Sequence, residues 1–294
     1  MRRRRRWRPG GRHVLLVLLA VFLALPLYLA LVVATHSAAS VLRGVPVVPG
    51  NQLGANLATI FGPGIPGTPS ITTMLANSAV MALSVAVLKV VLSVPAAYAV
   101  TFFHFPGRRL AFALIFVTLM LPIEVRFFPT YAVTAHLGLL DTRTGLILPL
   151  IASATAVFLL RQSFRAFPLE LADAARLDGI GPLRFLTSVV LPLTRPILAA
   201  IFVLEFIYGW NQYLWPLLVS SSASQATIVM GVKEIISASQ SFAVPQWNLV
   251  MAITLVALVP PVIMVVLMQR WFVRGLMSGI NCAQTESSAP CLPG

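Results

Sequence analysis

The chain has 294 residues, of which 58% are hydrophobic and 10% are charged, whereas soluble domains average roughly 45–50% apolar residues. This composition excludes an ordinary soluble domain and predicts an all-α membrane protein with six transmembrane helices. The net charge of +13 would suit a nucleic-acid ligand in a soluble protein. Here, however, basic residues crowd into positions 1–12, directly before an apolar run. We therefore expect contact with membrane lipid and no nucleic-acid partner.

Residues 1–12 form a basic arm, and the apolar run of residues 14–34 that follows is long enough to cross a hydrocarbon core of about 30 Å. A cleavable signal peptide is the alternative. Its apolar region is typically only about 7–15 residues long, so we expect an uncleaved first span. The Pro/Gly-rich residues 36–72 predict an extracytoplasmic loop.

Further apolar segments predict the other five spans, the third of which we expect to break near Pro122 and Pro129. The final residues 276–294 are small and polar and predict a disordered tail. Cys282 and Cys291 lie in that tail and should be reduced if it is cytosolic. The five spans are expected at about residues 73–103, 110–121, 145–160, 197–219 and 249–272.

The distribution of positive charge predicts the orientation. Six spans place both termini on one side of the membrane. With that side in the cytoplasm, most Lys and Arg residues lie on cytoplasmic segments, as the positive-inside rule requires. The N- and C-termini are therefore expected to be cytoplasmic.

The charged segment of residues 163–196 predicts a helix, a turn and a second helix between two spans. Pro168 suits the start of a helix, and Gly179 can adopt the left-handed conformation that ends one. Pro182 can begin the second helix, which is expected to run to Pro192. Ala172, Ala174 and Ala175 make the first helix thin, so that a partner surface could approach its backbone.

This segment resembles the coupling loop of ABC-importer permeases, which has the pattern Glu-Ala-Ala, Gly and Leu-Pro. The matching residues are Asp173, Ala174, Ala175, Gly179, Leu191 and Pro192, with Asp173 in place of Glu. The resemblance implies that these residues couple the chain to a cytoplasmic ATPase subunit. Because the sequence has no G-x-x-x-x-G-K-[ST] motif, we expect ATP and Mg²⁺ to bind to that partner. No cofactor and no catalytic activity are expected in this chain.

Other stretches, including residues 77–78, 119–126 and 206–217, resemble permeases of carbohydrate-type importers, most closely those of the bacterial sn-glycerol-3-phosphate group. The resemblance implies the ABC type I importer permease fold, with a permease domain over residues 13–275 and its core over residues 73–272. It also implies a place in the inner membrane and three kinds of partner. These are a homologous second permease, an ABC ATPase dimer and an extracytoplasmic substrate-binding protein.

A phosphate ester that crosses a low-dielectric membrane needs cationic partners. Lys89 is the one basic residue deep inside a predicted span, and Arg126 lies near the outer end of another. The alternatives are that Lys89 extends to the membrane interface and that Arg126 pairs with Glu124. Glu205 would repel a phosphate, so we expect it to pair with Lys89 or with a partner subunit.

Polar and aromatic residues late in the fifth predicted span are candidates for binding a polyol, although aromatic residues also mark membrane interfaces. Import of another sugar, oligosaccharide or polyol remains an alternative. An ion-driven secondary transporter is a second one, although such carriers are expected to have inverted repeats and none is visible. The four histidines lack metal-ligand spacing, and no catalytic set is apparent. The polyol candidates are Tyr208, Trp210, Asn211 and Gln212.

Overall fold

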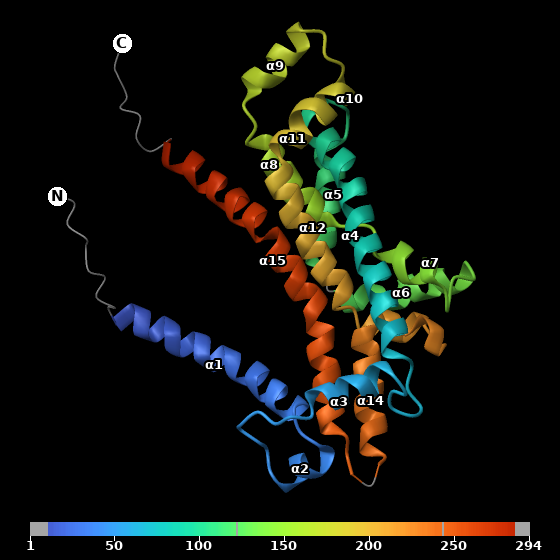
Figure 1. The fold of residues 1–294 in the computed structure, drawn as a ribbon. Helices are drawn as coiled ribbons and strands as arrows, with labels where there is room; N and C mark the ends of the chain where they lie inside the picture. The colour runs from blue at the N-terminus through green and yellow to red at the C-terminus, as the bar shows by residue number, and fades with distance from the viewer. Residues whose placement is uncertain (1–10, 122, 243, 286–294) are drawn as a thin grey trace, which may run out of the picture. The chain divides into compact units, whose positions relative to one another are not determined.

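The computed structural model describes residues 11–121, 123–242 and 244–285, and each regular element in these ranges is a helix (Figure 1). The chain forms two compact units. The first combines residues 1–72 with residues 231–258, and the second combines residues 73–230 with residues 259–294. The basic residues 1–10 and Cys291 lie outside the described residues.

The first unit contains α1 (Gly11–Ala34), α2 (Ala38–Arg43) and α3 (Leu53–Phe61). Two short helices therefore occupy a segment that was expected to be a loop. Buried Asn56 organises the unit because its side-chain amide donates hydrogen bonds to the carbonyls of Ala34 (2.8 Å) and His36 (2.9 Å). Asn248 in turn donates to the Asn56 side-chain oxygen (2.8 Å). These bonds join the end of α1 to the start of α15.

The second unit begins with most of α4 (Ile71–Phe102), a long helix that carries Lys89. The third predicted span is broken, because α5 ends at Met120 and α6 begins at Ile123, on either side of Pro122. The fourth is also broken, with a bend of 42° before α8. The bounds in this region are α5 (Arg108–Met120), α6 (Ile123–His136), α7 (Arg143–Ile147), the 3₁₀ turn η1 (Leu148–Leu150) and α8 (Ala154–Arg165).

The expected fifth span is not one helix. Its helix ends at Trp210, with a short separate helix after it, because Asn211 closes the first helix and Pro216 lacks the N–H that a continuous helix would use. The bounds here are α9 (Leu169–Leu177), α10 (Pro182–Phe185), the π turn η2 (Leu186–Val190), α11 (Leu191–Leu193), α12 (Arg195–Trp210), α13 (Leu214–Val219), the 3₁₀ turn η3 (Ala223–Gln225) and α14 (Ile228–Gln240).

The last helix, α15 (Trp247–Thr285), is longer than expected. It continues past residue 272, where the sixth span was expected to end, and into the segment predicted to be disordered from residue 276. No proline between Pro261 and Thr285 stops the helix. Within the described ranges, three helices are long and apolar enough to cross a membrane, and five spans result if each of two bent helix pairs counts as one.

A sharp connection in the second unit depends on Asp141. This residue has a left-handed backbone conformation (φ 57°), and its N–H donates to the Val219 carbonyl (2.8 Å). Its carboxylate accepts hydrogen bonds from the backbone N–H groups of Ser221 (3.0 Å) and Ser222 (2.9 Å). These bonds stabilise the ionised form and lower the pKa of the Asp141 carboxyl below its ordinary value.

The lowered pKa predicts an acid-sensitive connection. Because the folded state binds this proton less readily than the unfolded state, the stabilisation is complete above the ordinary carboxyl pKa, about 3.9. It is lost as the pH falls through the lower folded value. We expect Asp141→Asn, which tolerates the same backbone conformation, to lower the melting temperature at about pH 7. The difference should shrink as the pH falls below the ordinary carboxyl pKa of about 3.9. An unchanged difference across that range, measured by differential scanning fluorimetry, would contradict the assignment.

Candidate coupling loop and substrate cavity

The segment of residues 163–196 forms the predicted helix, turn and second helix. α9 ends in a Schellman motif: the N–H of Ile180 bonds to the Ala175 carbonyl (2.9 Å) and that of Gly179 to the Arg176 carbonyl (3.1 Å). Gly179 has φ 71°, as predicted for the residue that ends this helix. Ile180 packs at the edge of the apolar cluster beneath the loop. The end of α9 is therefore fixed by hydrogen bonds and by apolar contact.

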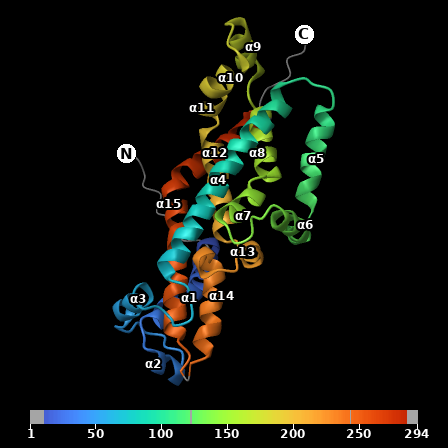
Figure 2. The ribbon, with the colours of Figure 1, turned by 90° about the vertical axis from the view of Figure 1, so that its right-hand side faces the viewer.

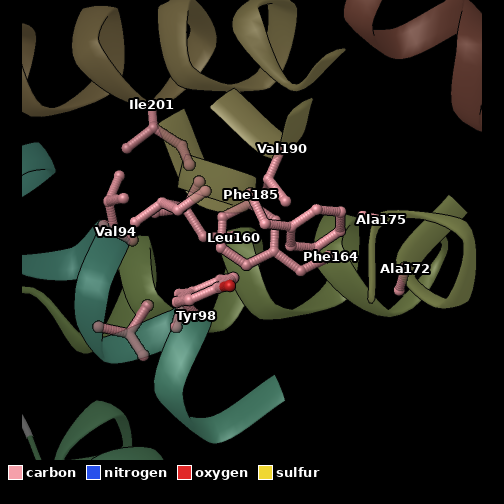
Figure 3. Close-up of a cluster of buried hydrophobic side chains, with 13 residues drawn as sticks. Val94, Tyr98, Leu160, Phe164, Ala172, Ala175, Phe185, Val190 and Ile201 are labelled. Carbon is pink, nitrogen blue, oxygen red and sulfur yellow. The ribbon is translucent and has the colours of Figure 1, made fainter. Parts of the chain in front are cut away.

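The three alanines of α9 lie on two different faces of the helix, so they do not make it uniformly thin toward a partner. Ala172 and Ala175 are buried against the chain's own apolar cluster, so their small size serves internal packing (Figure 3). Asp173 and Ala174 are exposed, and Leu177 is 90% exposed. The face that remains open to a partner carries Asp173 and its ion-pair partner Arg176 beside exposed Leu177, so it combines both signs of charge with apolar surface.

The second helix of the loop contains a π turn immediately before the Leu191-Pro192 pair. The N–H of Leu191 bonds to the Leu186 carbonyl five residues earlier. Pro192 has no N–H to donate, and a wider turn accommodates that loss. The chain then bends by 79° between residues 182–193 and α12. The Leu-Pro pair therefore precedes the bend that leads from the loop into the membrane segment.

Aromatic packing fixes the base of the loop. The Tyr98 hydroxyl at the end of α4 donates a hydrogen bond to the Pro182 carbonyl (2.9 Å), the first residue of α10. Phe102 lies beside Tyr98 and packs against Phe164 and Phe185, with ring centroids 6.2 and 5.6 Å away. Figure 3 shows Tyr98, Phe164 and Phe185 converging from α4, α8 and α10. Sequence reasoning missed this role of Tyr98, since a tyrosine at the end of a span is also typical of a membrane interface.

If the loop couples the chain to an ATPase, as its resemblance to importer permeases implies, Tyr98→Phe should reduce transport per ATP hydrolysed without preventing folding. One hydrogen bond with a net contribution of about 1 kcal/mol is lost, while the ring contacts stay. Tyr131→Phe is a matched control, because the Tyr131 hydroxyl makes no hydrogen bond within the described part of the chain. Equal ratios of transport to ATP hydrolysis in the two variants would show that the Tyr98 bond has no part in coupling.

A buried ion pair lies between α4 and α12. Lys89 Nζ is 2.7 Å from Glu205 Oε2, and these residues are 4% and 7% exposed. The Ser153 hydroxyl donates to Glu205 Oε1 (2.6 Å). Lys89 Nζ also lies 3.6 Å from the centroid of the Tyr208 ring, a distance typical of a cation–π contact. The expected pairing of Glu205 with Lys89 is therefore present.

These residues line a cavity of about 500 Å³ that Arg126 also lines. Arg126 and Tyr208 border a second, smaller cavity as well. Neither Lys89 nor Glu205 is available as a lone charge, whereas Arg126 is exposed and pairs with no acidic side chain that the structure describes. Glu124, its possible partner, has a side chain outside the described set.

The other predicted substrate residues have different positions. Trp210 is 3% exposed and stacks on Phe206, with ring centroids 5.9 Å apart. Asn211 is exposed at the end of α12, and the Gln212 amide donates to the Tyr208 carbonyl (3.2 Å). These three residues line neither cavity. The structure thus brings together Lys89, Arg126 and Tyr208.

Ser153 is one of the cavity residues that sequence reasoning missed. It caps α8, since its hydroxyl accepts a hydrogen bond from the Ala156 N–H (3.1 Å). Serine before a helix is a recognisable capping signal. Its second partner, Glu205, is 52 residues away in sequence and could not be inferred locally.

The sequence profile of the family described as "Binding-protein-dependent transport system inner membrane component" matches residues 89–278. The chain belongs to this family. Membership confirms the expected resemblance to ABC-importer permeases and a multi-pass location in the inner membrane. It also means that the chain is a transport component rather than an enzyme.

Individual members of this permease family are closely similar to this chain in sequence. The chain is 51% identical over 268 residues to the sn-glycerol-3-phosphate transport system permease protein UgpE of Yersinia pestis bv. Antiqua (strain Antiqua), covering 90% of this chain and 94% of the relative. It is 46% identical over the same length to the protein of the same name from Agrobacterium fabrum (strain C58 / ATCC 33970).

A solved structure supports the fold. The crystal structure of a bacterial ABC transporter involved in the import of the acidic polysaccharide alginate contains a chain that matches with a TM-score of 0.75 at 24% identity. The match covers 89% of this chain and 95% of that chain. The importer-permease fold is therefore shown, and the regular elements of the described residues are all helices.

Proposed function

We propose that this chain is the transmembrane subunit of an ATP-driven importer that moves sn-glycerol-3-phosphate into the cytoplasm. The proposal rests on one observation. Over 90% of its length, the chain is 46–51% identical in sequence to permeases named for that substrate. The partners are a homologous second permease, an ABC ATPase dimer that binds ATP and Mg²⁺, and an extracytoplasmic binding protein that delivers the substrate.

The proposed architecture has six spans with both termini in the cytoplasm. Three continuous helices and two bent pairs supply five spans, and the α5–α6 pair supplies the other. The basic arm of residues 1–12 and the predominance of positive charge on the coupling-loop side support this orientation. The permease domain extends over residues 13–275, with its core over residues 73–272, and a cytoplasmic tail follows from residue 276.

The loop of residues 163–196 is proposed to dock into a groove of the ATPase. Exposed Asp173, Ala174 and Leu177 form the docking face, while Gly179 and the Leu191-Pro192 pair set the shape of the loop. A hydrogen bond and a ring contact join the loop to α4, and one apolar cluster includes both Phe185 of the loop and Phe164 of α8. A displacement of α9 by the ATPase would therefore be transmitted to the helices that line the cavity. ATP binding would thus change the side of the membrane to which the cavity opens.

Within the cavity, Arg126 is the proposed principal contact for the phosphate. The charge of Lys89 is already balanced by Glu205, so Lys89 shapes the cavity and adds a weaker positive potential. Tyr208 presents its ring to Lys89 and borders both cavities. The C-terminal end of α12 is formed by Trp210 and followed by Asn211 and Gln212. Of these three residues, Asn211 is exposed and is the one proposed to contact a polyol during transport.

The deciding experiment measures uptake of labelled sn-glycerol-3-phosphate into vesicles that contain this chain with its partner subunits. We expect uptake to require ATP on the ATPase side, and excess unlabelled substrate to inhibit it where maltose does not. Arg126→Gln should reduce uptake by about tenfold or more, with Arg143→Gln as a matched control on an exposed arginine outside both cavities. Uptake of a neutral sugar instead would overturn the substrate assignment, and uptake by this chain alone without ATP would overturn the importer assignment.

A further inference from the structure

A buried carboxylate lies in the wall of the cavity that is proposed to admit an anion. Glu205 lines the cavity of about 500 Å³ together with Arg126, and it is 7% exposed. Like charges repel more strongly in a low-dielectric site than in water, so an unshielded carboxylate here would oppose the entry of a phosphate ester. The contacts that hold the Glu205 side chain therefore bear on the kind of substrate that the cavity admits.

Both oxygens of the Glu205 carboxylate have a donor within the chain. Oε2 is 2.7 Å from Lys89 Nζ, and Oε1 accepts a hydrogen bond from the Ser153 hydroxyl at 2.6 Å. The second distance is typical of a strong bond between a hydroxyl and a charged carboxylate. Lys89 lies on α4, Ser153 precedes α8 and Glu205 lies on α12, three helices that run side by side (Figure 2). The carboxylate is thus fixed by two elements other than its own helix.

Ser153 is itself held so that its proton is available to Glu205. Its hydroxyl oxygen accepts a hydrogen bond from the Ala156 N–H (3.1 Å), and its carbonyl accepts one from the hydroxyl of buried Ser93 on α4 (3.5 Å). A hydroxyl can accept and donate at the same time. Aspartate also caps helices, but it would place a second negative charge beside Glu205 and, when ionised, could not donate to it. The two contacts together require a side chain that both accepts and donates.

We propose that Ser153 is a positioning residue that determines the charge selectivity of the cavity. By occupying Oε1, its hydroxyl keeps the Glu205 carboxylate against the protein wall, so that exposed Arg126 sets the sign of the open space. Without the hydroxyl, Oε1 would have no donor among the described residues, and it would find one in the cavity, either water or the Arg126 guanidinium. Either outcome lowers the attraction of the cavity for an anion. The inference rests on the proposed function only for the identity of that anion.

The test measures the charge of the cavity with thiol reagents on the complete transporter. Thr155→Cys places a thiol at an exposed position that lines the same cavity, in a background with Cys282 and Cys291 replaced by serine. The rates of modification by a sulfonate-bearing and a trimethylammonium-bearing methanethiosulfonate are compared, because their ratio is insensitive to changes in access that affect both reagents. Ser153→Ala should lower the ratio of the anionic to the cationic rate by about threefold or more. Ser153→Thr, which keeps the hydroxyl, should leave the ratio within about twofold of its original value.

Two controls separate this role from simple helix capping. Thr142→Ala removes another capping hydroxyl, which accepts a hydrogen bond from the Gly145 N–H (3.0 Å) outside both cavities, and it should leave the ratio unchanged. In a Glu205→Gln background, Ser153→Ala should also leave the ratio unchanged, because no carboxylate remains to be released.

Three outcomes would overturn the inference. They are equal changes in Ser153→Ala and Thr142→Ala, the same change with and without the Glu205 carboxylate, and an unchanged ratio in a Ser153→Ala variant that retains its melting temperature. The reagents report on charge without any substrate. A shifted ratio in a transporter that does not take up sn-glycerol-3-phosphate would therefore support the role of Ser153 and count against the proposed substrate alone.

Discussion

Removing one partner of the Lys89–Glu205 ion pair is expected to lower the free energy of unfolding by about 3–5 kcal/mol. Both side chains are buried and 2.7 Å apart. Lys89→Met leaves the Glu205 carboxylate without its counter-charge. Glu205→Leu removes the acceptor of both the Lys89 ammonium group and the Ser153 hydroxyl. The double variant removes both charges together, so it should recover most of the lost stability.

The measurement is denaturant or thermal unfolding of the detergent-solubilised transporter. Arg176→Met is a matched control, because it breaks an ion pair with Asp173 at 3.0 Å in which both side chains are 66% exposed. Such pairs contribute about 0–1 kcal/mol. Single variants of Lys89 and Glu205 that are no less stable than Arg176→Met would contradict the prediction. If the double variant regains stability but not uptake, the pair also acts in transport.

A second large effect is expected at Gly179. Its φ of 71° costs a residue with a Cβ about 1–2 kcal/mol, and a β-branched residue more. No neighbouring atom lies within 4 Å of the position where a Cβ would stand, so the penalty comes from the backbone alone. Gly179→Val should therefore depopulate the docked shape of the loop by about tenfold or more. ATP-dependent uptake should fall accordingly, while membrane insertion is kept.

Gly181→Val is the matched control for this substitution. Gly181 belongs to the same loop and has equally open surroundings, but its φ of −65° suits any residue. We expect near-normal uptake and ATPase activity from this variant. Equal uptake in the two valine variants, at equal amounts of protein in the membrane, would show that the left-handed turn is not needed for coupling.

The parts of the molecule that could be predicted from sequence depend on local or very costly interactions. Gly179 was predictable because few residues other than glycine adopt its conformation. The pairing of Lys89 with Glu205 was predictable because single charges inside spans are strongly unfavourable. Both predictions needed a rule about one or two residues and no knowledge of packing.

Features that depend on the three-dimensional arrangement could not be read from the sequence. Ala172 and Ala175 turn inward because a cluster from α4 and α8 lies beneath them, and a small residue fits an internal contact as well as a partner. Trp210 is buried by Phe206 rather than placed in the cavity. The break between Trp210 and Leu214 contains the polar residues Asn211 and Gln212. Apolar residues on both sides of it make composition alone interpret the whole stretch as one span.

The interruption before α8 has a consequence for water inside the membrane. Backbone groups that leave a helix at membrane depth must be covered by protein or hydrated, because lipid offers them no hydrogen bonds. Ala152 and Ser153 lie at this interruption and line the cavity of about 500 Å³. We therefore expect the cavity to hold water rather than acyl chains. A cysteine at position 152 should then react with a small, membrane-impermeant thiol reagent from one side of the membrane, and the reactive side should change when the transporter binds ATP.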